Sequence, residues 1–210
     1  LEDPFALELD YTRCMMAFLL FHPDPRRCLM IGLGGGSLAK FFHRRLPALR
    51  THCVEYDERV IDTARTLFHV PKDDARLRVE HGDGVEALAP ECCDLLVVDG
   101  FEDENLPAAL VSQAFFDAAW GALEEDGMLV MNAMDDDRHF DRNLQRLERA
   151  FGGAVLALNA DAIYGSDLLD SFDIIGFDPR GTGESIPAID CIDDYDAIFA
   201  RGDITPDNQA

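Results

Sequence analysis

The amino-acid sequence predicts an α/β protein, a three-layer sandwich in which a mostly parallel sheet lies between two layers of helices. Two observations carry this prediction. Apolar runs alternate with helical patterns through the first 150 residues, which is typical of parallel strands joined by crossover helices. The run DLLVVDG, Asp94 to Gly100, is apolar almost throughout instead of alternating, as expected of a strand covered on both faces.

The individual elements follow from these runs and from helical periodicity. Strands are expected at Cys28–Gly32, His52–Tyr56, Leu77–His81, Asp94–Asp99 and Met128–Asn132. Helices are expected at Gly36–Arg45, Glu58–Phe68, Val85–Leu88, Pro107–Leu123 and Arg138–Phe151. The last of these helices is the clearest, because its apolar residues recur at steps of three and four while charged residues fill its other face.

The chain changes character after residue 160, which divides it into a first domain, 1–160, and an acidic tail, 161–210. The tail holds twelve acidic residues and two arginines, a net charge of −10. Within it, FDIIGFD at 172–178 is predicted to add the last strand of the sheet in antiparallel direction. This placement expects Ile174, Ile175 and Phe177 to be buried. Residues 181–210 are rich in turn formers and are expected to be mostly irregular.

Composition excludes several classes of function. The net charge of −23 argues against a nucleic-acid partner, because a phosphate-binding surface needs a basic patch. No apolar run approaches the ~18 residues that a membrane span needs. The start of the chain lacks the pattern of a signal peptide, so a cytoplasmic location is expected. The six cysteines form no C-x-x-C pair and the six histidines no H-x-x-x-H pair, so no metal is expected.

A glycine-rich loop after the first strand indicates a nucleotide or nucleoside site. Gly32, Gly34 and Gly36 lie between an apolar run and a helical pattern, and Glu55 ends the next strand. Such a loop lets the backbone approach a ligand, and the acid can accept hydrogen bonds from ribose hydroxyls. A dinucleotide fingerprint needs Gly or Ala at Ser37, whereas G-x-G-x-G is the spacing of S-adenosylmethionine enzymes. An ordinary strand-to-helix turn is the alternative.

Asp83, in HGDGVEAL after the third strand, is a second candidate ligand residue. A carboxylate at that point can meet the amino group of adenine. The D-x-x-E spacing with Glu86 is also a capping arrangement for a following helix. The two interpretations are compatible, because a helix cap at this position lies at the edge of the sheet where ligands bind.

Five segments, which follow one another in family order over roughly residues 5 to 158, carry a resemblance to a known family. They are YTRCMMAFLLFHPDPRRCLMIGLGGGSLAKFF, VEYDERVIDTAR, VEHGDGVEAL, DLLVVDGFEDENLPAALVSQAFFDAAWGALEEDGMLVMN and RAFGGAVLAL. The chain is similar to the spermidine synthase family, particularly its shorter bacterial spermidine-synthase-like members. The resemblance implies the Rossmann-like fold of S-adenosylmethionine-dependent methyltransferases. It also implies decarboxylated S-adenosylmethionine as substrate, with its aminopropyl group passed to an amine such as putrescine.

The same resemblance assigns roles to individual residues. It makes Glu55 the ribose ligand and Asp83 the adenine contact. Asp99 falls where family members keep the aspartate that accepts a proton from the attacking amine, and Glu102 falls on the second acid of that stretch. A carboxylate is needed there because an ammonium group is no nucleophile. The plain alternatives are a loop-start acid for Asp99 and a solvated loop residue for Glu102.

Gly35 departs from the family pattern, and this departure leaves the reaction open. Authentic spermidine synthases carry an aspartate there, which grips the amine of the decarboxylated nucleoside. The expected function is therefore a transferase that binds S-adenosylmethionine or its decarboxylated form and transfers an aminopropyl group to a small amine. The alternatives are an S-adenosylmethionine-dependent methyltransferase and a non-catalytic nucleoside-binding or scaffold domain. The oligomeric state is open, with a homodimer as one alternative.

The tail carries a second resemblance. LLDSFDIIGFDPRGTGESIPAIDC, residues 168–191, looks like a fragment of α/β-hydrolases related to tripeptidyl aminopeptidases. A nucleophile elbow G-x-S-x-G does not follow in the sequence. Hydrolase activity is therefore not expected, and Ser166 and Ser185 are interpreted as turn residues.

Overall fold

A seven-stranded sheet forms the middle layer of the protein, as seen in a computed structural model that describes residues 3–101, 106–133, 140–152, 155–159 and 173–177. Five strands are parallel: β1 (Arg27–Ile31), β2 (Arg50–Glu55), β3 (Leu77–His81), β4 (Cys93–Val98) and β5 (Leu123–Ala133). Two more strands, β6 (Val155–Asn159) and β7 (Asp173–Phe177), complete the order β3-β2-β1-β4-β5-β7-β6. The predicted α/β fold with a parallel sheet is thereby confirmed for β1 to β5.

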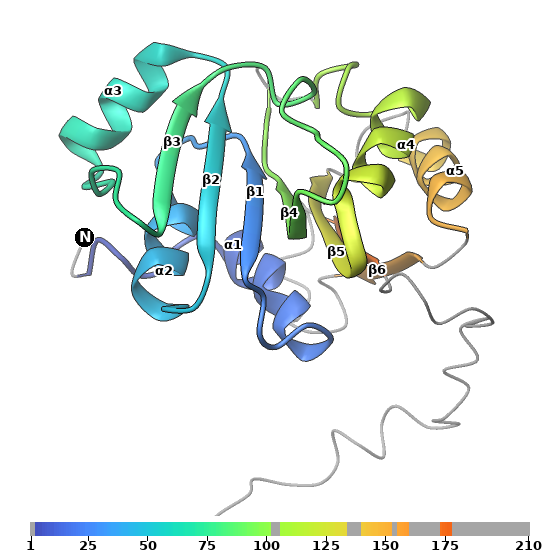
Figure 1. Ribbon diagram of the computed structural model, residues 1–210, viewed down its shortest axis with the longest axis horizontal. Coiled ribbons are helices and arrows are strands. Elements are labelled where there is room, and N and C mark those ends of the chain that lie inside the picture. The colour runs from blue at the N-terminus through green and yellow to red at the C-terminus, as the bar shows by residue number, and fades with distance from the viewer. Residues whose placement is uncertain (1–2, 102–105, 134–139, 153–154, 160–172, 178–210) are drawn as a thin grey trace, which may run out of the picture.

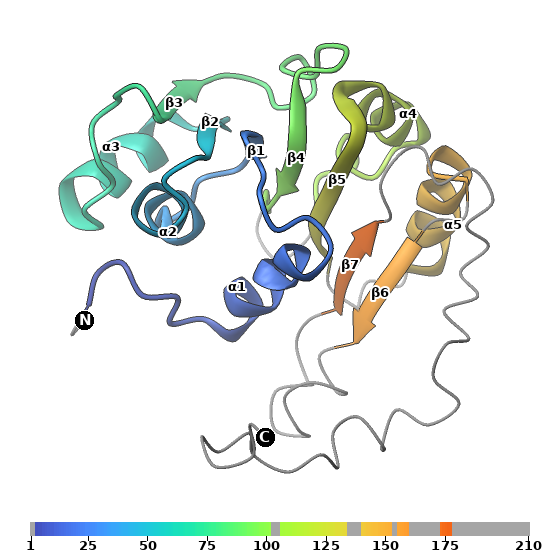
Figure 2. The ribbon, with the colours of Figure 1, turned by 60° about the horizontal axis from the view of Figure 1, so that its bottom comes forward.

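Helices lie on both faces of this sheet (Figures 1 and 2). One layer holds α1 (Asp10–Met15), the short 3-10 helix η1 (Met16–Leu20), α2 (Ser37–Arg45) and α3 (Glu58–Leu67). The other layer holds α4 (Gln113–Ala122) and α5 (Phe140–Ala150). Figure 2 shows α4 and α5 together on the side of β4 and β5 that faces away from α1 and α2.

Each layer has its own hydrophobic core, because consecutive strand residues point to opposite faces. Met30 and Val97 pack with Phe42 of α2 in one core. Ile31 and Val98 pack with α4 and α5 in the other. All six residues of β4 are buried, which explains why that part of the sequence does not alternate.

One predicted helix is wrong, and α4 and β5 begin well away from their expected first residues, whereas the other elements differ from their expected bounds by two residues at most. Residues 85–88 form a turn instead of a helix, with Asp83 Oδ1 accepting a hydrogen bond from Val85 N at 2.8 Å. The segment is short and runs into Pro90, which lacks an N–H donor and disfavours the helical conformation in Ala89. A turn with a capping aspartate is therefore enough to satisfy the local backbone.

The helix predicted from Pro107 begins instead at Gln113. The reason is Ser112, whose hydroxyl accepts a hydrogen bond from Phe115 N at 3.0 Å and so caps α4. Strand β5 begins at Leu123 rather than Met128, because Leu123 already pairs with Cys93 of β4. Arg138, where the last helix was expected to begin, lies outside the described residues, and α5 is observed from Phe140.

Within the described part of the chain, no helix is both long and apolar enough to cross a membrane. The buried side chains expected at Ile174, Ile175 and Phe177, and the irregular structure expected for 181–210, lie outside what the structure describes. The carboxyl ends of β1 to β5 meet at one edge of the sheet, and the residues that follow these strands form the site described next.

Candidate active site

The glycine loop after β1 is held against the loop after β4. Gly32 has a φ of +94°, and a Cβ atom there would lie 2.2 Å from the carbonyl oxygen of Asp99. Asp99 N also donates to Ile31 O at 2.9 Å. Glycine is therefore required at position 32 both by its backbone conformation and by this close approach.

The other two glycines of the motif have different roles. Gly36 precedes α2 with a φ of +69°, and a Cβ atom there would lie 2.2 Å from a methyl group of Val70. Gly34 has a φ of +51°, but a Cβ atom there would meet no atom within 4 Å. Two glycines are thus explained by packing, whereas Gly34 presents bare backbone to open space, where a ligand can approach it.

Glu55 joins the glycine loop to the beginning of α3. One carboxylate oxygen accepts a hydrogen bond from Leu33 N at 2.8 Å, and the other accepts from Asp57 N at 3.0 Å. Because each carboxylate oxygen has two lone pairs, both can still accept a bond from a ligand hydroxyl. The Glu55 side chain is partly exposed, so the predicted ribose ligand is both held in place and accessible.

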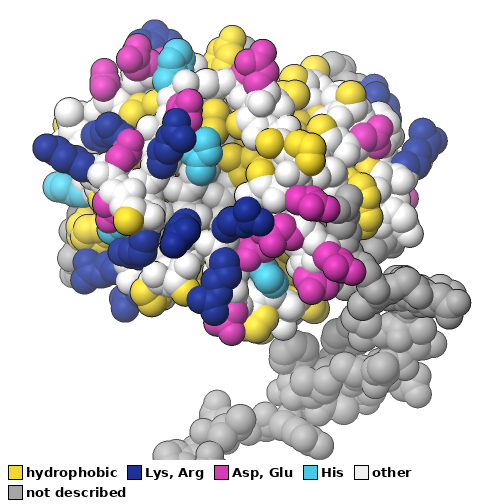
Figure 3. Space-filling view, viewed as in Figure 1, with side chains coloured by type: hydrophobic (Ala, Val, Ile, Leu, Met, Phe, Trp, Pro, Cys, Tyr) yellow, Lys and Arg dark blue, Asp and Glu magenta, His cyan; other side chains and the backbone are white. Residues whose placement is uncertain are grey.

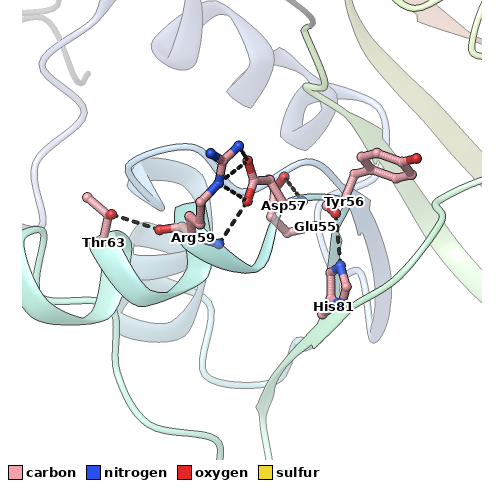
Figure 4. A network of polar contacts seen from close by, with 6 residues as sticks. All are labelled: Glu55, Tyr56, Asp57, Arg59, Thr63 and His81. Atoms are coloured by element: carbon pink, nitrogen blue, oxygen red, sulfur yellow. Dashed lines mark hydrogen bonds and ion pairs between the residues drawn. The ribbon is translucent and has the colours of Figure 1, made fainter.

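Figure 4 shows the polar contacts that surround Glu55. Asp57 caps α3 by accepting a bond from Arg59 N at 2.9 Å, and its carboxylate also binds the Arg59 guanidinium. These hydrogen bonds lower the pKa of Asp57 to about 2. His81 at the end of β3 contacts the carbonyl oxygen of Tyr56 at 3.0 Å. Tyr56 follows Glu55 directly, and its side chain is 77% exposed beside the site.

Asp83 lies in an exposed loop that is tied to the same edge of the sheet. Gly82 N donates to the carbonyl oxygen of Glu55 at 2.9 Å. A Cβ atom on Gly84 would lie 2.3 Å from a methyl group of Ile31, so this loop packs on the end of β1. Asp83 uses one oxygen to accept a hydrogen bond from Val85 N, so it caps a turn and not the helix that the D-x-x-E spacing predicted.

Asp99 at the end of β4 is held by two side chains from distant parts of the sequence. Asn132 Nδ2 donates to Asp99 Oδ1 at 3.0 Å, and the Tyr11 hydroxyl donates to Asp99 Oδ2 at 3.4 Å. Burial raises the pKa of Asp99, while these two hydrogen bonds oppose the rise. Burial, together with the Asp99 charge, also raises the pKa of Tyr11 well above its ordinary value. Asp99 therefore binds a proton more readily than an exposed aspartate does.

Asn132 carries a further acceptor at this point. Its side chain is 2% exposed, and its Oδ1 atom is buried without a hydrogen-bond partner among the described residues. Buried polar atoms usually have a partner, so an unpaired amide oxygen beside Asp99 is suited to a ligand donor such as an ammonium group. Sequence patterns did not mark Asn132 or Tyr11 as site residues, since both act through contacts between distant segments.

Lys40 is a third residue that the sequence did not reveal. It is 4% exposed, and its ammonium group donates to the carbonyl oxygen of Phe68 at 2.8 Å. Burial lowers the pKa of Lys40. The bond fixes the segment after α3, in which His69 has a φ of 61°, so that Val70 packs against Gly36. Lys40 thus helps to hold Val70 in the position where it packs against the glycine loop.

Glu102 lies outside the described residues, so its predicted place beside Asp99 has no structural test. Within the described ranges, no three His, Cys, Asp or Glu side chains are grouped in a way that could hold a metal ion. The described candidates all lie at the carboxyl ends of parallel strands or between such a strand and the next helix: Gly32, Gly34, Gly36, Glu55, Asp83 and Asp99. The structure therefore brings the described sequence candidates to one edge.

Two solved structures of transferases have a fold similar to that of this chain. Human methyltransferase-like protein 13, in complex with SAH, superposes with a TM-score of 0.69 at 24% identity, covering 83% of this chain and 84% of that one. Spermidine synthase from Thermotoga maritima superposes with a TM-score of 0.66 at 23% identity, covering 83% of this chain and 60% of that one. The chain therefore has the fold shared by these transferases.

The sequence comparison is more specific. The model of the spermine/spermidine synthase domain matches residues 8–159. A polyamine aminopropyltransferase from Neisseria meningitidis serogroup A is 37% identical over 165 residues, which are 77% of this chain and 63% of that protein. This chain belongs to the spermine/spermidine synthase family. It spans somewhat less than two thirds of the length of the aminopropyltransferase that it matches.

Proposed function

We propose that this protein is a transferase that binds S-adenosylmethionine or its decarboxylated form and passes a group from the sulfonium to a small amine. The observation that carries the proposal is the position of Asp99. This partly buried carboxyl group has a raised pKa, is held by Tyr11 and Asn132, and lies against Gly32 of the nucleoside loop. Family membership supports an aminopropyl group as the one transferred.

In the proposed site, Glu55 accepts hydrogen bonds from the ribose and Asp83 from the adenine amino group. Gly34 lets the nucleoside approach the backbone, since its surroundings are open. Glu102 would orient the amine from the loop after β4. No metal takes part in this proposal, and the predicted cytoplasmic location remains an expectation from the sequence.

Asp99 performs the proposed proton transfer. An amine arrives as an ammonium ion, donates one hydrogen bond to Asp99 and a second to Asn132 Oδ1, which has no partner among the residues that the structure describes. Asp99 then takes the proton, which frees the nitrogen lone pair. The sulfonium supplies the electrophilic carbon, and its sulfur leaves as a neutral thioether. Tyr11 and Asn132 keep the carboxylate aimed at the amine throughout.

Methyl transfer from intact S-adenosylmethionine is the second candidate, and Gly35 favours it. Where spermidine synthases have a carboxylate for the amine of the nucleoside, this loop has only backbone. The adjacent α2 begins without a side-chain cap, so its first N–H groups favour an anion such as the carboxylate of intact S-adenosylmethionine.

We further propose the chain organisation 1–160 and 161–210, with 172–178 supplying the last, antiparallel strand. The pairing of β7 with β5 supports this direction: Asp173 lies opposite Ala133, and Gly176 lies opposite Val130. In the proposed organisation the tail contributes one antiparallel strand to the sheet of the first domain.

Calorimetric titration tests the proposed function. We expect binding of S-adenosylmethionine or its decarboxylated form, weaker binding of NAD, and loss of nucleoside binding in Glu55→Ala. Asp99→Asn should keep nucleoside affinity but lower amine turnover about 100-fold or more. Binding without turnover of any amine, unchanged in Asp99→Asn, would identify a non-catalytic nucleoside-binding domain. Failure to bind any adenosyl nucleoside would overturn both the proposed transferase and the non-catalytic nucleoside-binding domain.

A further inference from the structure

Five arginines lie at the edge of the sheet opposite the candidate active site, around the amino ends of β1, β2 and β3. We call them the arginine cluster, and they are Arg26, Arg27, Arg50, Arg76 and Arg78. Their backbones are neighbours: Arg27 is in register with Arg50, and Arg50 N donates to Arg26 O at 2.9 Å. Figure 3 shows Lys and Arg side chains gathered over β1 to β3 and α2.

Acidic side chains satisfy only part of this cluster. Arg27 pairs with Glu124, and Arg78 pairs with Glu80 at 2.7 Å. Asp94 approaches the same edge, and its carboxylate is already bound by the backbone N–H groups at the beginning of β1, at 2.7 and 2.8 Å. Asp74 is a fourth acid at this edge, and its carboxylate is bound by Arg76 N and Leu77 N at 2.7 and 2.9 Å. Four acids do not offset the charge of all five arginines.

Arg26 and Arg50 carry the unsatisfied part of that charge. Both are exposed, and neither has an ion-pair or side-chain hydrogen-bond partner within the part of the chain that the structure describes. Like charges directly opposite on neighbouring strands destabilise a sheet. An arrangement of this kind is suited to an anionic partner that lies across several strands at once.

Strand β7 ends at this edge of the sheet, and the sequence that follows it is acidic. Because β7 passes from Asp173 opposite Ala133 to Gly176 opposite Val130, it runs toward the amino ends of the parallel strands. Residues 178–210 follow directly and contain eight acidic residues and two arginines, a net charge of −6. Strand β1 is three strands away from β7, or ~14 Å, a distance that about five extended residues can span.

We propose that the acidic segment 178–210 docks on the arginine cluster of the same chain. The proposal rests on the antiparallel last strand proposed above and is independent of the transfer chemistry at the opposite edge. Single exposed ion pairs contribute only about 0–1 kcal/mol each and are screened by salt. Docking therefore depends on several pairs acting together, and it weakens as ionic strength rises.

Paramagnetic broadening in NMR spectra of the full chain tests this docking. A nitroxide on Cys191 labels the segment selectively in a Cys92→Ser background, because Cys14, Cys28, Cys53 and Cys93 are buried. At low salt, the amide signals of Arg26, Arg27 and Arg50 should lose more than about half of their intensity, and they should recover in 1 M salt.

Paired variants make the test specific. Arg26→Ser with Arg50→Ser should relieve the broadening at Arg27. The matched control, Arg142→Ser with Arg149→Ser, removes the same charge from exposed positions of α5 and should not. Broadening that is absent, equal on α5, or unaffected by salt and by the cluster substitutions would overturn the proposal.

Two further measurements distinguish docking within one chain from contacts between molecules, and docking from nucleoside binding. Mixing labelled, isotopically silent chain with unlabelled ¹⁵N chain reports contacts between molecules, and broadening that arises only in this mixture would also overturn docking within one chain. Titration of S-adenosylmethionine in the same samples, followed at Leu33 and Tyr56, tests the proposed nucleoside site separately. A loss of docking therefore cannot be mistaken for a failed nucleoside site.

Discussion

Gly32 and Asp99 lie so close that the glycine has no room for a side chain: a Cβ atom would be 2.2 Å from the Asp99 carbonyl oxygen. Backbone atoms cannot rotate away as the end of a flexible side chain can. This contact joins the nucleoside loop to the carboxylate that we propose as the proton acceptor. The two halves of the site are therefore mechanically coupled through one glycine.

Gly32→Ala should lower the free energy of unfolding by about 3 kcal/mol, because it adds a backbone clash to an unfavourable φ of +94°. Gly34→Ala is the matched control, since it also has a positive φ but meets no atom within 4 Å. Its cost should be about 1 kcal/mol. Urea denaturation measures both, and equal losses for the two variants would show that the contact with Asp99 does not decide the requirement for glycine.

Glu55→Gln should weaken both the loop and the ligand site. The amide keeps one acceptor, but its NH₂ group faces an N–H donor of Leu33 or Asp57. We expect a loss of about 2 kcal/mol in stability and about tenfold in nucleoside affinity. Glu58→Gln, exposed in the first turn of α3, is the control. Calorimetry that finds the two variants equally good binders would remove Glu55 from the site.

Asp99 gives the stability of the protein a distinctive pH dependence. Its pKa is raised by burial in the folded state, whereas the pKa of an aspartate in an unfolded chain is about 3.9. The folded state therefore holds this proton more tightly, so the contribution is full below the unfolded pKa and is lost as pH rises through the folded pKa. The stability of the wild type relative to Asp99→Asn should be greatest below about pH 4, and this advantage should shrink toward neutral pH.

Urea denaturation of both proteins across that range measures the difference. Asp126→Asn, which removes one negative charge from an exposed position of β5, is the control for a general charge effect. If the stability difference between the wild type and Asp99→Asn stays constant with pH, or grows toward neutral pH, the raised pKa of Asp99 is refuted.

Gly35→Asp should be tolerated, because a Cβ atom there would meet only the Phe68 ring at 3.7 Å. Position 35 also does not have the positive φ of its neighbours. We expect stability to change by less than about 0.5 kcal/mol. Preference for the decarboxylated nucleoside should rise about tenfold, because the new carboxylate can bind the ammonium group and repels the carboxylate that only intact S-adenosylmethionine carries.

Gly35→Asn tests whether charge, rather than size, causes this shift. The amide has nearly the same shape but no negative charge, so it should leave the preference almost unchanged. The measurement is the ratio of dissociation constants for S-adenosylmethionine and its decarboxylated form. An identical ratio in wild type and in both variants would mean that position 35 does not contact that end of the nucleoside.

The sequence predicted the parallel strands well because each is marked by a buried apolar run, and β3 was predicted with its observed bounds, Leu77–His81. Short polar segments were harder. At residues 85–88 a capping aspartate and a nearby proline outweigh weak helical periodicity. At the beginning of α4, the hydroxyl of Ser112 decides the first helical residue, and Pro107 does not.

The site could be predicted only as far as a local rule applies. Parallel strands end at a common edge, so Glu55, Asp83 and Asp99 could be placed there from their positions alone. The partners of Asp99 could not, because Tyr11 is 88 residues away and Asn132 is 33 residues away along the chain. Contacts of that range depend on how helices and strands pack, which no local pattern encodes.

The two hydrogen bonds of Glu55 have a consequence for the thermodynamics of ligand binding. A glutamate side chain that must be ordered by its ligand loses about 0.5–1.5 kcal/mol of rotamer entropy at that moment. Here Leu33 and Asp57 already fix the carboxylate in the unliganded chain, so that entropic cost falls on folding. A nucleoside therefore meets a rigid acceptor, and its binding should be accompanied by little ordering of the protein around the ribose.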